Sequence, residues 1–67
     1  MSAWLDQVFQ ADQANNGGVV RRSVDDVLKH SSRNELVTEA RQRGFHVVET
    51  GDQFVIICNT GELKIHC

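Results

Sequence analysis

The sequence predicts an α+β fold, with two or three helices packed on one face of an antiparallel β-meander. Three observations predict it. Apolar residues recur at helical spacing up to residue 43, and the period changes to two after Gly44. Ser23 and Ser32 each open a helix-capping pattern. Glycine-containing turns at 50–52 and 59–62 separate short runs with strand character. The 67 residues make one small domain, 1–67.

The N-terminal segment, residues 1–16, predicts an amphipathic helix over 3–14. Trp4 and Val8, and likewise Leu5 and Phe9, are spaced by four residues and therefore form one apolar stripe. The run Asn15–Gly18 is typical of a helix end, because asparagine and glycine accept the left-handed conformation. This segment also carries the only tryptophan.

Residues 19–22 allow two interpretations, a short edge strand or an extended linker. Two valines favour a strand, and the two arginines after them suit an outer edge, where charge discourages further pairing. If this segment pairs, the sheet has four strands. Residues 23–43 then predict a pair of helices, 24–30 and 33–43, each with acidic residues in its first turn, where the helix dipole favours them. Gly44 is the expected glycine after the second helix.

Residues 45–67 predict three strands, 45–49, 53–58 and 63–67, joined by hairpins. Side chains alternate across a strand, so the hairpins divide these residues between two faces of the sheet. Either Thr50-Gly51 or Gly51-Asp52 forms the first turn, and Thr60-Gly61 forms the second. One face is apolar throughout and is the predicted core: Phe45, Val47, Phe54, Ile56, Cys58, Leu63, Ile65 and Cys67.

The opposite face of this predicted sheet is the first candidate binding surface. It is more apolar than a solvated face usually is, with a patch of valine and isoleucine surrounded by histidine and lysine. One hairpin register places His46 and His66 on either side of Val55, and the other places His46 beside Ile57. The candidate binding residues are His46, Val48, Val55, Ile57, Lys64 and His66.

The cysteines and histidines near the end of the chain do not form a catalytic or metal site in this arrangement. Cys58 and Cys67 lie four positions apart along the strand direction, about 13 Å, which exceeds the reach of a disulfide or a shared zinc ion. His66 and Cys67 are neighbours on a strand and point to opposite faces. We therefore predict no catalytic residues, no metal and no cofactor.

Charge is the second guide to function. Nine acidic and seven basic residues give a net charge of −2, which disfavours nucleic-acid binding because that binding depends on neutralising phosphates. No apolar run approaches the roughly 20 residues of a membrane-spanning helix, so we expect no membrane association and a cytoplasmic location. The basic residues that could still bind an anion or a nucleic acid are Arg21, Arg22, Arg33, Arg41 and Arg43.

Residues 32–55, "SRNELVTEARQRGFHVVETGDQFV", resemble the opening of the HicA family of small toxin ribonucleases. Leu36, Gly44, Phe45 and Gly51 carry the resemblance, which covers about a third of the chain. It implies a double-stranded-RNA-binding-like fold with a helix–β–β–β order. The catalytic histidine of that family corresponds to Gln53 here, so the resemblance does not carry ribonuclease activity.

Together these observations predict a non-catalytic binding or regulatory module. Its expected partner is a protein, including a second copy of itself, because so small a core gains from association. The alternative is a nucleic-acid-binding protein, or a degenerate HicA-like ribonuclease, that uses the five arginines.

Overall fold

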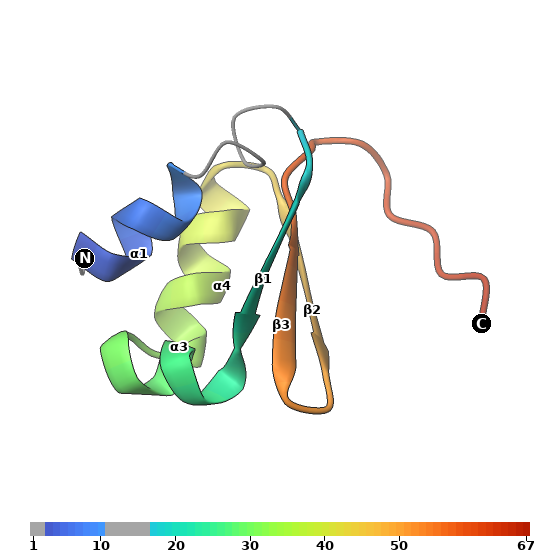
Figure 1. Ribbon diagram of the computed structural model, residues 1–67. Helices are drawn as coiled ribbons and strands as arrows, with labels where there is room; N and C mark the ends of the chain where they lie inside the picture. Colours follow the sequence, from blue (N-terminus) through green and yellow to red (C-terminus); the bar gives the residue numbers. More distant parts are fainter. Residues whose placement is uncertain (1–2, 11–16) are drawn as a thin grey trace.

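The computed structural model of this chain describes residues 3–10 and 17–67 (Figure 1). It confirms the α+β class, with three helices and a three-stranded antiparallel sheet in the described residues. The predicted N-terminal helix is confirmed as far as Phe9, and residues 11–14 of that prediction lie outside the described part of the chain. The elements are α1 (Ala3–Phe9), β1 (Val19–Ser23), α3 (Val24–His30), α4 (Arg33–Gln42), β2 (His46–Thr50) and β3 (Gln53–Ile57).

Serine side chains begin both helices of the central pair, as predicted. The Ser23 hydroxyl accepts a hydrogen bond from the backbone N–H of Asp26 at the start of α3 (3.1 Å). The Ser32 hydroxyl accepts from the N–H of Glu35 at the start of α4 (3.1 Å). Each serine satisfies one of the amide groups that the first turn of a helix leaves unpaired. The Glu35 carboxylate accepts from the Ser31 hydroxyl (2.8 Å), which joins the end of α3 to the start of α4.

The end of α4 turns the chain into the sheet. Gly44 has a φ of +75°, and the N–H groups of Gly44 and Phe45 donate to the carbonyl groups of Arg41 and Ala40 (3.0 and 2.9 Å). This is the Schellman pattern, which needs a left-handed residue immediately after the helix and so favours glycine there. It fixes the direction in which β2 begins.

The sheet has the order β1-β3-β2, so β3 is its central strand. Thr50 pairs with Gln53, which selects Gly51-Asp52 from the two predicted turns of the β2–β3 hairpin. Gly51, at the first position of this two-residue turn, has a φ of +51°. Residues 19–23 pair antiparallel with β3, with Val19 opposite Ile57 and Ser23 opposite Gln53. Of the two interpretations of this segment, the edge strand is therefore correct and the linker is wrong.

The predicted third strand, 63–67, is wrong, and with it the 45–67 meander. A strand can pair along two edges only, and β1 and β2 occupy both edges of β3. The predicted hairpin turn at Thr60-Gly61 is also wrong: the chain bends here, where the N–H of Gly61 donates to the Asn59 side chain (3.0 Å), and leads away from β3. Residues 62–67 continue as an extended, exposed segment, here called the tail (Figure 1). Leu63, Ile65 and Cys67 are consequently not core residues.

The hydrophobic core lies between the helices and alternate residues of the strands. In Figure 1 all three helices lie on the same side of the sheet. They contribute buried side chains to one cluster with those of β1 and β3, and Val47 of β2 packs against it. The helix–β–β–β order that the family resemblance implied is likewise wrong, because α4 is followed by β2 and β3 and residues 63–67 form no third strand. The buried residues are Leu5, Val8, Phe9, Val20, Val27, Leu36, Ala40, Phe54, Ile56 and Cys58.

Arg33 connects the start of α4 to the sheet. Its guanidinium forms two hydrogen bonds to the carboxylate of Glu49 on β2 (2.9 and 3.1 Å), and it lies over the ring of Phe54 on β3 (5.6 Å to the ring centre). The charged hydrogen bonds raise the pKa of Arg33. This contact places Glu49 and Phe54 on the helix side of the sheet.

The placement of the tail outside the core can be tested with one substitution made at two sites. We expect Ile56→Val to lower the free energy of unfolding by about 0.5–1.5 kcal/mol, because it removes a buried methyl group. Ile65→Val should change it by less than about 0.5 kcal/mol, because Ile65 is 80% exposed. Urea denaturation of both variants at a concentration where the chain is monomeric gives the comparison. An equal loss of unfolding free energy in the two variants would contradict this placement and indicate that Ile65 is a core residue.

Candidate interaction surface

The face of the sheet opposite the core, here called the reverse face, carries four adjacent β-branched side chains. They are called the apolar row below: Val19, Val48, Val55 and Ile57. The strand pairing aligns Val19, Ile57 and His46 across the three strands, and aligns Arg21, Val55 and Val48 in the next row. Directly paired residues of antiparallel strands point to the same side, so these six side chains share the reverse face. In Figure 1 no described helix lies on this side.

The apolar row is accessible to a partner. Val19 and Val48, on the two outer strands, are 44% and 38% exposed, whereas Val20 on the core side of β1 is 4% exposed. Val55 and Ile57, on the central strand, are half-buried by their neighbours. Four β-branched side chains thus form a contiguous surface that no described element covers, and such a surface is typical of an interaction site.

The structure brings together four of the six residues predicted for this face: His46, Val48, Val55 and Ile57. Of the two predicted registers, the one that places His46 beside Ile57 is correct, and the one that places it beside Val55 is wrong. Lys64 and His66 are the exceptions, because they belong to the tail and not to a strand of this sheet. His66 therefore does not lie across β3 from His46.

Sequence reasoning missed Val19 and Arg21, which β1 adds to the reverse face. The signal was present in the two β-branched residues, Val19 and Val20, that begin the segment. It was not decisive, because five residues between a glycine pair and a helix fit a linker equally well. The pairing depends on residues more than 30 positions away, which local sequence does not report.

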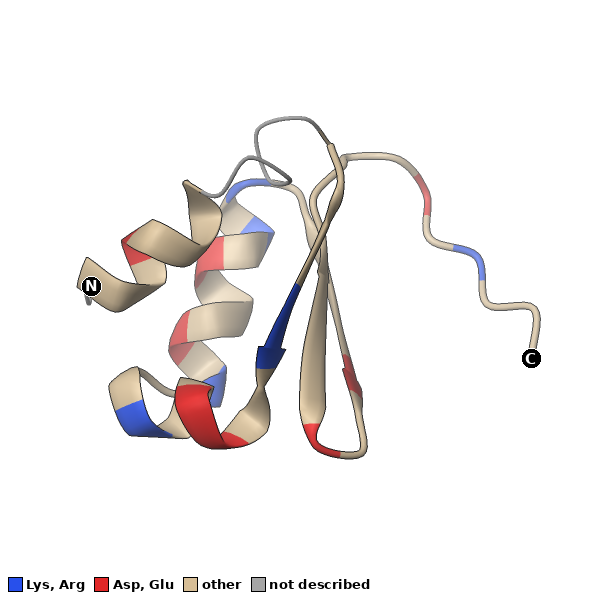
Figure 2. Cartoon of the chain, viewed as in Figure 1, with Lys and Arg blue, Asp and Glu red and all other residues tan. Residues whose placement is uncertain are grey.

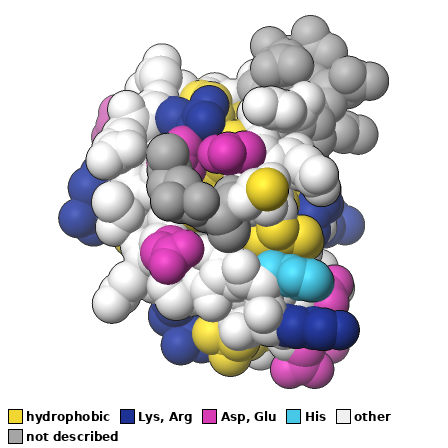
Figure 3. Space-filling view, turned by 90° about the vertical axis from the view of Figure 1, so that its left-hand side faces the viewer, with side chains coloured by type: hydrophobic (Ala, Val, Ile, Leu, Met, Phe, Trp, Pro, Cys, Tyr) yellow, Lys and Arg dark blue, Asp and Glu magenta, His cyan; other side chains and the backbone are white. Residues whose placement is uncertain are grey.

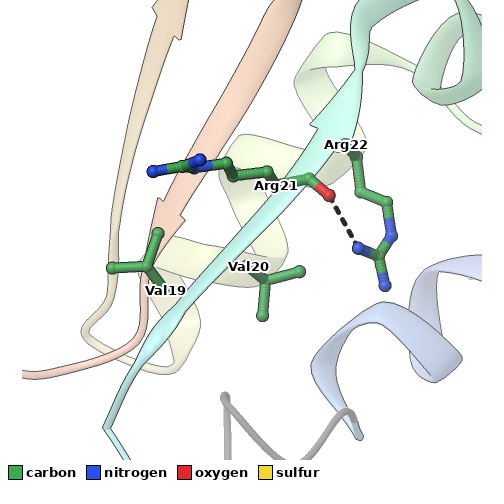
Figure 4. A pocket seen from close by; sticks show the side chains of 4 residues that line it. All are labelled: Val19, Val20, Arg21 and Arg22. Carbon is green, nitrogen blue, oxygen red and sulfur yellow. Dashed lines mark hydrogen bonds between the residues drawn. The ribbon is translucent and has the colours of Figure 1, made fainter.

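The two outer edges of the sheet differ. Along β1, the carbonyl of Gly18 accepts from Cys58 and the N–H of Val24 donates to Asp52 (2.9 and 2.8 Å). The alternation of an antiparallel ladder then directs the backbone groups of Arg21 outward. The guanidinium of Arg22 donates to this outward carbonyl (2.7 Å), and the two arginine side chains diverge around the hollow beside β1 (Figure 4). Arg22 thus blocks this edge against another strand.

The edge of β2 is open by comparison. The two-residue turn makes Thr50 and Gln53 a hydrogen-bonded pair, so the alternation directs the backbone groups of Val47 and Glu49 away from β3. No strand of the described residues lies beyond β2. This edge can therefore accept a further strand.

A hollow of about 350 Å³ lies beside the β2 edge, on the helix side. The ring Nε2 of His46 donates to the carbonyl of Gly61 (2.6 Å), which holds the start of the tail near the beginning of β2. Leu63 lies at the border of the hollow and remains 39% exposed. Residues of α4 and of the β2 strand form the remainder of its lining: Val37, Ala40, Arg41, Phe45, His46 and Val47.

The five candidate arginines do not converge on one site. Arg33 is paired with Glu49, and Arg43 is paired with Glu39 (2.9 Å) while its guanidinium lies over Phe9 (4.8 Å). Arg21 faces the reverse side of the sheet and Arg22 the core side, by their positions in the ladder. Acidic and basic segments alternate along the chain (Figure 2), and the space-filling view shows both signs interspersed on the face that it presents (Figure 3). A single basic surface is therefore not formed by these residues.

The two cysteines have different environments, and both are free thiols. Cys58 is buried, and its thiol points to the carbonyl of Ile56 (3.6 Å). Burial raises the pKa of this thiol, and the nearby Arg43 opposes the effect only in part. Cys67 is exposed at the end of the tail. The described residues contain no group of three histidine, cysteine, aspartate or glutamate side chains placed to hold a metal ion.

Comparisons with other proteins add no assignment to this geometry. No family model, curated protein sequence or solved structure matches the chain. Gln53 begins β3 with an exposed side chain. Within residues 3–10 and 17–67, none of the helices has the length and apolar character needed to cross a membrane.

The difference between the thiols leads to a test of the site geometry. A thiol reagent at pH 8 should label one cysteine per folded chain rapidly, and Cys67→Ala should remove that rapid reaction. The reason is that Cys58 is enclosed and its raised pKa leaves little reactive thiolate. In denaturant, Cys58 should react at the rate of an ordinary cysteine. Rapid labelling of Cys58 in the folded chain would contradict its placement in the core.

Proposed function

We propose that this chain is a non-catalytic module that associates with a second copy of itself through its open sheet. The observation that carries the proposal is the uncovered apolar row of the reverse face, which continues to the unprotected edge of β2. The association surface therefore comprises Val48 and its neighbours on β3, together with the outer edge of β2.

The size of the domain supports a partner of this kind. A core of fewer than about 80 residues rarely provides more than about 3–5 kcal/mol of stability. The chain leaves β-branched residues on the sheet that a second layer or a further strand would bury, and each such burial adds favourable free energy. A second copy supplies the same apolar surface and the same open edge, so the contact can close on itself with two-fold symmetry.

Sedimentation velocity over a wide concentration range tests this proposal. We expect the full chain to form a dimer, and we expect Val48→Lys to raise the dimer dissociation constant by about tenfold or more, equivalent to about 1.4 kcal/mol. The lysine places a charge on both the apolar row and the edge strand.

Thr38→Lys is the matched control for this test. It adds the same charge at an exposed position on α4, away from the sheet, and should leave the dimer unchanged. A chain that remains monomeric at the highest concentration reached would refute self-association. An equal effect of both substitutions would indicate a general charge effect and would remove the sheet from the contact.

A second candidate function, duplex DNA recognition, rests on a different observation. Helices α3 and α4 are joined by Ser31 and Ser32 alone, and α4 precedes the β2–β3 hairpin. Two helices with a tight connection form a helix-turn-helix arrangement, in which the second helix can enter the major groove. The exposed side of α4 carries polar residues of the types that read base edges: Asn34, Thr38, Arg41 and Gln42. The net charge and the scattered arginines argue against strong binding to phosphates.

Fluorescence anisotropy with a mixed-sequence DNA duplex in low salt tests the second candidate. If α4 binds DNA, Arg41→Ala should weaken binding by about 1–3 kcal/mol, the range for a base-reading side chain. Arg21→Ala removes an equally exposed arginine from the reverse face and should have no effect. Absence of binding at low salt, where phosphate contacts are strongest, would exclude this function.

A further inference from the structure

The tail has the sequence pattern of a strand but pairs with no strand of the described residues. Leu63, Ile65 and Cys67 alternate with Lys64 and His66. Such alternation is typical of a strand with one apolar side. All five residues are exposed, Ile65 to 80%, and the central strand has no free edge to offer them. The tail is therefore an unpaired strand beside an open sheet.

The direction of the tail excludes a simple antiparallel pairing with its own β2. Strand β3 runs antiparallel to β2, and in Figure 1 the tail leaves the end of β3, extends away from the helices and descends, as β2 does. The tail thus runs in the same direction as β2 of its own chain. A two-fold axis perpendicular to the sheet reverses this relation, so each tail runs antiparallel to the β2 of the other copy.

We infer that the tail of one copy pairs antiparallel with the open edge of β2 in a second copy, with Ile65 opposite Val47. This register places Leu63 opposite Glu49 and Lys64 opposite Val48. The outward backbone groups of Val47 and Glu49 then bond with Ile65 and Leu63, as the ladder requires. The inference rests on the proposed self-association and specifies how it is made.

Side-chain chemistry favours this register over one that is shifted by a single residue. Val47 lies on the helix side of the sheet and borders the hollow that α4 and β2 form. Opposed residues share a face, so the register directs Leu63, Ile65 and Cys67 of the partner tail toward the hollow. Lys64 and His66 then lie on the reverse face, opposite Val48 and His46. A shift by one residue would direct the apolar side chains away from the hollow.

The exchange also explains the choice between the two sheet edges. Pairing of the tail with β1 of another copy would be head-to-tail, because β1 lies at the opposite edge of the sheet from β2. Such a contact does not close and leads to chains of copies. Arg22 also occupies the outward carbonyl of Arg21 on that edge. Exchange at β2 closes with two copies, so the expected product is a dimer.

Disulfide trapping tests the register directly. Val48 and Lys64 would form a non-hydrogen-bonded pair, whose close approach suits a disulfide. In a chain carrying Cys67→Ala, we expect V48C and K64C variants, mixed and oxidised, to give a crosslinked heterodimer. A mixture of V48C and I65C should crosslink far less. Preferential crosslinking of V48C with I65C would overturn the register, and crosslinking of V48C with itself would indicate direct pairing of two β2 strands in place of tail exchange.

A charge substitution in the intact chain provides an independent test. We expect Ile65→Lys to raise the dimer dissociation constant by about tenfold or more, because it places a charge opposite Val47 and adds a second cation to a hollow that already contains Arg41. Gln42→Lys adds the same charge at an exposed position of α4 and serves as the control. Ile65 is exposed in the single copy, so the monomer should fold normally in both variants.

The outcomes separate the two proposals. A wild-type chain that never dimerises would refute the proposed function, and the exchange with it. A dimer that Val48→Lys weakens and Ile65→Lys leaves intact would keep self-association and refute the tail exchange. Formation of long polymers would indicate pairing with β1 and would also overturn the closed exchange at β2.

Discussion

The central strand β3 can pair along only two edges, and the organisation of the molecule depends on which segments occupy them. One edge of β3 is occupied by β2, which is joined to it by a two-residue turn at Gly51-Asp52. The other edge is filled by β1, from the opposite end of the helical pair. With β1 in this position, the chain encloses both helices between its first and last strands. Residues 63–67 cannot pair with β3 because β1 and β2 occupy both of its edges.

This arrangement concentrates the apolar side chains unevenly. Phe54 and Ile56 are enclosed on the helix side, while Val55 and Ile57, which alternate with them, face the side without a described helix. A strand that is apolar on both sides is typical of a sheet covered on both faces. The proposed association starts from this uneven distribution of apolar side chains. The tight connection between α3 and α4 is a feature of the same fold, and fold alone does not decide function.

The two outer edges of the sheet differ in how well their backbone groups are protected. At β1, Arg22 satisfies an outward carbonyl from within the strand, which is one of the ways in which proteins discourage edge pairing. At β2, the ion pair between Glu49 and Arg33 lies on the helix side and leaves the backbone of the edge uncovered. The start of the tail is held beside this same edge by His46. The sheet is therefore asymmetric, with a blocked side and a side open to a further strand.

The sequence by itself determined the elements whose signals are local. The serine caps at 23 and 32 and the glycine after α4 depend on a few neighbouring residues, and all lie where they were predicted. The sequence limited the first hairpin turn to two positions, and the structure has Gly51-Asp52. The alternation after Gly44 also identified four residues of the reverse face, because the period of a strand does not depend on its partner.

Only the tertiary structure decided which segment pairs with the second edge of β3. Residues 19–23 and 63–67 both have strand character, and they compete for one edge. Periodicity cannot rank two such segments, because the outcome depends on how the helical pair returns the chain to the sheet.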